Sequence, residues 1–179
     1  AIAAEWWRGL QRTTGDGKPN PGADPGALAR LRRCATPIEA LTESATIQLC
    51  RRLGGKADHF RRVESIATLA ILLSHVRDDL KASTLGAMLG ATREGEMAVM
   101  SDLRLRQLMA ARDAQELLRG LREALSLLGG QAPVEDLAGL VLNWFHPTHG
   151  ERTRTRFLFA YHGAIDAAPP ANGDDAPTA

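Results

Sequence analysis

Apolar residues recur at every third or fourth position over most of this chain, which is the spacing of one face of an α-helix. The pattern is clearest in residues 113–128, where five leucines fall within about 100° on a helical wheel. Residues 58–76 are apolar on every side around the stretch IATLAILL, which predicts a helix covered by several neighbours. No segment alternates apolar and polar residues as a half-buried strand does. The pattern therefore predicts an all-α protein of about eight helices with no sheet.

Capping residues and helix breakers predict where the helices begin and end. Asp24 and Asp113 precede two helices as N-caps. Thr36, Pro37 and Glu39 form a capping box at the start of another. The apolar spacing continues that helix to residue 53, where two glycines end it. Further helices are predicted over residues 3–12, 58–76, 101–111, 133–145 and 152–165.

The helices are expected to form a helical bundle in two lobes within this chain of 179 residues. We expect an N-terminal helical lobe over residues 1–80 and a C-terminal helical lobe over residues 101–166. Residues 81–100 mix small, polar and glycine residues without a clean period, which predicts a mobile connection with at most a short helix at residues 85–89. The acidic, proline-bearing segment 167–179 is predicted to be a disordered tail.

The positive charge of the chain lies in four separate islands, although the formal net charge is only +1. Residues 1–34, 51–63, 104–122 and 152–156 carry net charges of +3, +4, +3 and +3, and the segments between them are acidic. A fold that brings such islands together has a basic face, which suits a polyanion. Arginine supplies 19 of the 22 basic residues, and a guanidinium grips phosphate through paired hydrogen bonds. Genome composition can also produce an arginine excess, so the islands are stronger evidence for polyanion binding than the excess itself.

Helix geometry predicts where two of these arginines point. In the helix over residues 113–128, Arg119 and Arg122 lie about 90° or more from the centre of the leucine stripe. Both should therefore be exposed on one flank of the helix. The alternative is that this flank holds local ion pairs, because Glu116 and Glu123 lie within one turn of Arg119.

The last island holds three arginines with few acidic residues nearby. Arg152 and Arg156 share a helix face at a spacing of four residues, whereas Arg154 points elsewhere. After Glu151 the next acidic residue is Asp166, so we favour contact of these arginines with phosphate. The pairs Arg32 with Arg33 and Arg104 with Arg106 are similar candidates.

Catalysis and metal binding are not supported by any constellation in the sequence. A Walker loop, a glycine fingerprint after a strand and a nucleophile elbow are all missing, so no catalytic residue and no cofactor is predicted. His146 and His149 are a weak metal candidate, because no third ligand lies near them. Cys34 and Cys50 are expected to be reduced thiols. The longest apolar stretch is far shorter than the roughly 20 residues of a membrane span, so we expect a soluble, cytoplasmic protein.

Aromatic residues are too few to form a platform on which bases stack. The chain has one tyrosine, four phenylalanines and three tryptophans, and Trp6 and Trp7 are expected to pack inside the protein. Recognition of nucleic acid should therefore involve the backbone and not the base sequence.

Five sequence segments occur in an order that matches a known family. They are WWRGL, LARLRRC before a proline-led helix, SDLRLRQLMAARDAQELLRGLREALSLL, LNWF and RTRTRFLFAYH. In order and spacing they resemble the CasB family, the small subunit of the type I-E CRISPR surveillance complex Cascade. The resemblance covers about residues 5–163.

The resemblance implies a non-catalytic helical protein of antiviral defence that binds guide RNA and target DNA. Members sit as a dimer along the complex, contact its backbone and large subunits, and steady the R-loop by holding the displaced strand. The family positions with basic residues correspond here to Arg33, Arg104, Arg122, Arg154 and Arg156, and less closely to Arg32, Arg119 and Arg152. The chain departs from the family at Phe157 and at Tyr161-His162, where members often carry Arg-Trp and Tyr-Tyr.

These observations together predict that the islands meet along one track for a nucleic-acid strand. The rival hypothesis is a structural adaptor whose arginines contact acidic protein partners. A helix-turn-helix regulator is a third possibility, but no segment shows the residues of a recognition helix. The basic run 51–62 is the island that the resemblance supports least.

Overall fold

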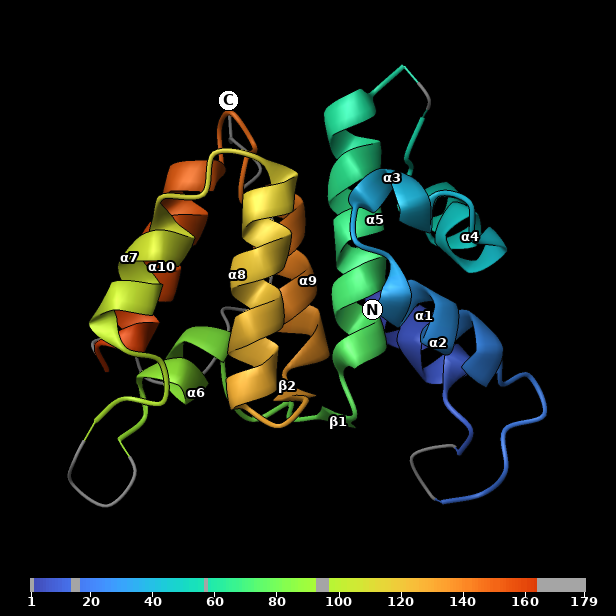
Figure 1. The fold of residues 1–179 in the computed structure, drawn as a ribbon, viewed down its shortest axis with the longest axis horizontal. Coiled ribbons are helices and arrows are strands. Elements are labelled where there is room, and N and C mark those ends of the chain that lie inside the picture. Colours follow the sequence, from blue (N-terminus) through green and yellow to red (C-terminus); the bar gives the residue numbers. More distant parts are fainter. Residues whose placement is uncertain (1, 14–16, 57, 93–96, 164–179) are drawn as a thin grey trace, which may run out of the picture.

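The structure is a computed structural model that describes residues 2–13, 17–56, 58–92 and 97–163. Within these residues the chain forms ten α-helices and one two-stranded sheet (Figure 1). The helices are α1 Ile2–Leu10, α2 Pro25–Arg33, α3 Pro37–Ala40, α4 Ser44–Arg52, α5 Phe60–His75, α6 Leu85–Gly90, α7 Asp102–Met109, α8 Ala114–Leu127, α9 Val134–Asn143 and α10 Gly150–Tyr161. The all-helical class is thus confirmed apart from this small sheet. The predictions of about eight helices and of no sheet are wrong, and the predicted tail lies outside the described residues.

The two strands are β1 Asp78–Asp79 and β2 Gln131–Ala132, and they pair in parallel. Each strand follows a long helix, α5 or α8, and these two helices lie side by side and run in the same direction (Figure 1). The chain therefore leaves both helices on the same side of the molecule. A carboxylate oxygen of Asp79 then accepts the backbone N–H of Val134 at 3.0 Å, which anchors the start of α9. Strands of two residues are too short to show an alternating pattern.

The helix predicted over residues 37–53 is divided into α3 and α4. The capping box is present, because the Thr36 hydroxyl accepts the Glu39 N–H at 3.3 Å and the Glu39 carboxylate accepts the Ala35 N–H at 2.7 Å. The Thr42 hydroxyl donates to the Glu39 carbonyl at 2.7 Å, so it competes for a backbone acceptor of the helix. Glu43 then adopts an extended backbone as the N-cap of α4, so the helix does not continue from α3. Ile38 on α3 is 64% exposed.

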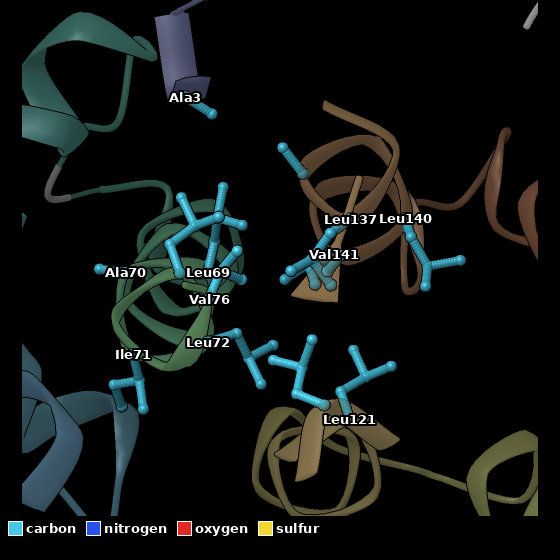
Figure 2. Close-up of a cluster of buried hydrophobic side chains, with 14 of the residues drawn as sticks. Ala3, Leu69, Ala70, Ile71, Leu72, Val76, Leu121, Leu137, Leu140 and Val141 are labelled. Carbon is cyan, nitrogen blue, oxygen red and sulfur yellow. The ribbon is translucent and has the colours of Figure 1, made fainter. Parts of the chain in front are cut away.

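Helix α5 is the centre of the hydrophobic core. Every residue from Ile66 to Ser74 is buried, as the all-round apolar sequence predicts. Figure 2 shows Leu72 pointing from α5 toward α8 and α9, which carry Leu121 and Val141 at this contact. The buried residues form one cluster that runs from α1 to α10, so residues of both predicted lobes share it. The lobe boundaries themselves stay a prediction.

The region predicted as a connection contains α6, which packs closely on α10. Two glycines of α6 face the α10 backbone, and a Cβ atom on Gly86 would lie 2.6 Å from the Phe157 carbonyl oxygen. Phe157 also packs edge-on against Trp144, with ring centroids 6.2 Å apart. The buried Tyr161 donates its hydroxyl to the Met100 carbonyl. Phe157 and Tyr161 are therefore packed inside this molecule, whereas His162 is exposed.

Candidate nucleic-acid interface

The turn after α2 is hydrogen-bonded to one side of α8. Gln115 donates its side-chain N–H to the Ala35 carbonyl at 2.8 Å, and Arg122 donates an Nη2–H to the Cys34 carbonyl at 2.6 Å. Positions seven apart lie on the same side of a helix, so the turn runs along a stripe of α8. We call this contact the α2–α8 seam. It joins two of the basic islands that are far apart in the sequence.

Two exposed arginines border the seam, and neither has a polar partner within the described ranges. Arg119 lies on the same stripe of α8, one turn from Gln115 and one turn from Arg122. Arg33 is the last residue of α2, directly before the fastened turn. Both side chains are exposed, and neither makes a hydrogen bond or ion pair to the described part of the chain. Arg33 and Arg119 thus belong to two elements that the seam joins.

Arg122 and Arg32 differ from Arg33 and Arg119, because their guanidinium groups donate hydrogen bonds to backbone carbonyls. Arg122 is half-buried, and its Nε–H donates to Nε2 of His75 at 3.2 Å in addition to the bond with Cys34. Arg32 donates its Nε–H to the Ser74 carbonyl at 2.5 Å. Burial lowers the pKa of Arg122, while nearby Cys34 and Glu39 raise it. The prediction that Arg122 is exposed beside Arg119 is wrong, because the turn after α2 and the end of α5 cover its flank.

A groove of about 540 Å³ between α7 and α8 continues from Arg119. Arg104 from α7 forms an ion pair with Glu123 at 2.6 Å in this groove. Arg112, in the connection between the two helices, is exposed, and its side chain has no partner among the described residues. The helices approach closely at Gly120, where a Cβ atom would lie 2.9 Å from Cδ1 of Leu108. Sequence reasoning missed Arg112, because no helical position marks it, although it lies inside a basic island.

The arginines of α10 are placed elsewhere in the molecule. Helix α10 packs on α6 and α9, and Arg152 at its start is exposed. Arg154 is half-buried and donates an Nη1–H to the Trp144 carbonyl at 2.6 Å. Arg156 lines a second pocket, of about 610 Å³, together with Arg8 and Lys81. The structure therefore gathers Arg32, Arg33, Arg104, Arg119 and Arg122 around α8 and holds the other three candidates on a different helix.

The pocket beside Arg156 is balanced in charge and unlike the seam. Three carboxylates line it, from Asp79, Glu135 and Asp136. Burial raises the pKa of Asp136, while the bond from the Leu85 N–H and the charge of Arg156 oppose that shift. Acidic and basic groups offset one another here, so the surplus of positive charge lies around α8.

Several other residues considered in the sequence have structural roles. The indole N–H of Trp6 donates to the Ala45 carbonyl at 2.9 Å, and that of Trp7 donates to the Val76 carbonyl at 3.3 Å. Both indoles are buried, so they pack inside the protein as expected. In the basic run 51–62, Arg52 forms an ion pair with Glu5 at 2.7 Å, and Arg62 donates to the Leu53 carbonyl at 3.4 Å.

The two neighbouring histidines stack on each other, with His146 and His149 ring centroids 4.5 Å apart. Nδ1 of His146 accepts backbone N–H groups of Thr148 and His149, so this nitrogen is already engaged. The described residues contain no group of three or more side chains that could hold a metal ion. In the same ranges, no helix is both long and apolar enough to cross a membrane.

The fold and the site define a small helical protein with arginines from several elements gathered around α8. Residues 27–162 match the family described as CRISPR-associated protein Cse2. The chain belongs to this family, which is the CasB family of the sequence resemblance.

One comparison concerns a solved structure, the crystal structure of E. coli Cascade bound to a PAM-containing double-stranded DNA target. The chain is similar to one chain of that structure, with a TM-score of 0.63 and 21% sequence identity. The alignment covers 90% of this chain and 95% of the other, which shows that the two share a fold. No curated protein matches the sequence.

Proposed function

We propose that this chain is the non-catalytic small subunit of a type I-E Cascade complex and stabilises the R-loop by gripping nucleic-acid backbone. The family membership and the fold shared with a chain of E. coli Cascade support membership in such a complex. The observation that carries the gripping role is the row of exposed guanidinium groups of Arg33, Arg119 and Arg112, which have no polar partner in the described part of the chain. The partners of the chain would be guide RNA and target DNA, the backbone and large subunits of the complex, and a second copy of the chain.

The physics of R-loop formation explains why weak backbone contacts are sufficient for this role. An R-loop replaces a DNA duplex with an RNA–DNA duplex of similar stability, so contacts with the strands can tip the balance. Exposed guanidinium groups without acidic partners keep their hydrogen-bond donors available for phosphate. A strand laid along the α2–α8 seam and the α7–α8 groove would be held independently of its sequence.

Reversing one charge of this row tests the proposal. In the assembled complex, Arg119→Glu is expected to weaken capture of target DNA about tenfold at low salt, because it removes a bond to phosphate and adds repulsion. The salt dependence of binding should also fall by about 0.7 for each single-strand phosphate that the variant no longer binds. Binding measured by fluorescence anisotropy over a salt series gives both quantities.

Arg51→Glu is the matched control for this experiment. Arg51 is exposed on α4, has no partner among the described residues and lies away from the seam. It changes the net charge by the same amount, so it reports the effect of total charge alone. Equal weakening of binding in both variants would contradict a localised strand contact.

The second candidate function is a structural adaptor, which two exposed apolar side chains favour. Leu103 on α7 is 67% exposed and Phe159 on α10 is 52% exposed, as expected where another protein covers them. Assembling the complex without this subunit separates the two functions. A shorter R-loop lifetime on DNA with a scrambled non-target strand supports strand holding, and a defect confined to assembly supports the adaptor.

A further inference from the structure

Three basic side chains converge where α2, α5 and α8 meet. Arg32 from α2 reaches the Ser74 carbonyl in the last turn of α5, at 2.5 Å. Arg122 from α8 reaches Nε2 of the neighbouring residue, His75, at 3.2 Å. Two guanidinium groups from different helices therefore meet at the same end of α5, and the charges of both act on the His75 imidazole.

No carboxylate forms an ion pair with either guanidinium in the described part of the chain. The acidic group that acts on Arg122 is Glu39, and its carboxylate already accepts the Ala35 N–H at 2.7 Å. Cys34 lies on the same side, and burial raises the pKa of its thiol, which keeps it neutral. The half-buried guanidinium of Arg122, beside the exposed Arg32, therefore has no paired anion in the described part of the chain, which is a costly arrangement unless an anion binds.

Among the residues that the structure describes, the other neighbours at this junction carry no carboxylate. The loop after α8 brings Gly130 against the His75 carbonyl, and Arg77 lies next to Gly130. Many hydrogen-bond donors remain available, because a guanidinium has five N–H groups. Arg122 uses two of its nitrogens and Arg32 uses one. The junction can therefore donate several hydrogen bonds to one anion.

The bond between Arg122 and His75 fixes the protonation state of the imidazole in the empty junction. Arginine is always a donor, so Nε2 of His75 must accept and cannot carry a proton. His75 is thus neutral when no anion is bound. Burial, followed by the charges of Arg122 and Arg32, lowers the pKa of His75 to about 4.

We propose that Arg32, Arg122 and His75 together bind one phosphate of a nucleic-acid backbone, and that His75 takes up a proton as the phosphate enters. The phosphate oxygens accept free N–H groups of the two guanidiniums, and Arg122 Nε turns away from the imidazole. Nε2 of His75 then takes one proton from solvent and donates it in a hydrogen bond to a phosphate oxygen. This inference rests on the proposed function and adds His75 to the strand-binding residues.

Proton uptake makes the binding depend on pH in a defined direction. A bound phosphate cancels the repulsion from the arginines, and its own negative charge favours the protonated imidazole and so offsets the cost of burial; the pKa of His75 should therefore rise from about 4 toward its ordinary value of about 6.5. Binding then strengthens as the pH falls through the pKa of the bound state. Proton uptake by His75 alone should make the affinity for the nucleic-acid strand about tenfold higher at about pH 5.5 than at about pH 7.5.

Histidine-selective NMR on the full chain tests the proposal without a mutation. The probe is a single-stranded DNA of about 12 nucleotides, which is long enough to follow one protein surface. We expect its addition to raise the pKa of His75 by about two units. Strand binding with an unmoved His75 would overturn the phosphate site and leave the proposed function standing. Failure of the strand to bind at any pH would overturn the proposed function itself.

A pair of variants gives an independent measurement of the same linkage. His75→Gln cannot gain a proton in this range, so its affinity for the strand should lose the roughly tenfold change between the two pH values. His162→Gln removes an exposed histidine at the end of α10 and should keep that change. Circular dichroism establishes that both variants are folded. An equal pH dependence in wild type and His75→Gln would contradict the site.

Discussion

Replacing Gly90 with alanine is expected to lower the free energy of unfolding by about 3 kcal/mol. Gly90 ends α6, and a Cβ atom there would collide with the carbonyl group of Tyr161 in α10. The colliding atoms belong to backbone, which cannot move aside as the end of a flexible side chain can. Relief would require α6 to move away from α10 and would disturb the buried Tyr161. Urea denaturation of the purified protein measures this destabilisation.

Gly139→Ala is the matched control, because the same change is made where there is space. Gly139 lies within α9, and a Cβ atom at this position would have nothing within 4 Å. Alanine there should stabilise the protein by about 0.5–1 kcal/mol, since glycine disfavours the interior of a helix. If both variants had the same stability, the close packing of α6 on α10 would be contradicted.

Replacing Arg122 with glutamine is expected to cost about 2 kcal/mol of stability and to weaken strand binding as well. The variant loses a charge-assisted hydrogen bond to the Cys34 carbonyl and the hydrogen bond to His75. The turn after α2 would then be held less firmly against α8, and Arg33 with it. The salt dependence of strand binding should therefore fall by more than the roughly 0.7 expected for one phosphate.

Arg119→Gln separates these two effects, since Arg119 lies one turn away and has no polar partner in the described ranges. We expect its free energy of unfolding to stay within about 0.5 kcal/mol of the wild-type value. The salt dependence of strand binding should fall by about 0.7, which is the contribution of one phosphate. Urea denaturation and a salt series with labelled single-stranded DNA give both values. Equal stability of the two variants would show that the α2–α8 seam does not depend on Arg122.

The positions of the helices could be predicted largely from local signals. Asp24 and Asp113 cap α2 and α8 with their side chains, each accepting a backbone N–H at 2.8 Å. The inward face of α9 was also predictable from apolar spacing, and Leu137 and Trp144 are fully buried. These signals act within one or two turns, so the sequence reports them directly.

Features that depend on distant segments could not be predicted in the same way. The pairing of β1 with β2 follows from the parallel packing of α5 and α8, which no short window contains. The wheel of α8 gives Arg119 and Arg122 similar positions, yet only Arg119 is exposed, because the turn at Cys34 covers the other. Arg112 became a candidate only when α7 and α8 were seen to form a groove around it.

The central position of α5 has a consequence for synthesis of the chain. Its buried face is completed by α8 and α9, which end about 50 and about 70 residues after His75. A ribosome adds roughly 5–20 residues per second, so the apolar helix emerges several seconds before the residues that cover it. During that interval the nascent chain exposes its most hydrophobic segment. The chain is therefore most prone to aggregate when translation beyond residue 75 is slow.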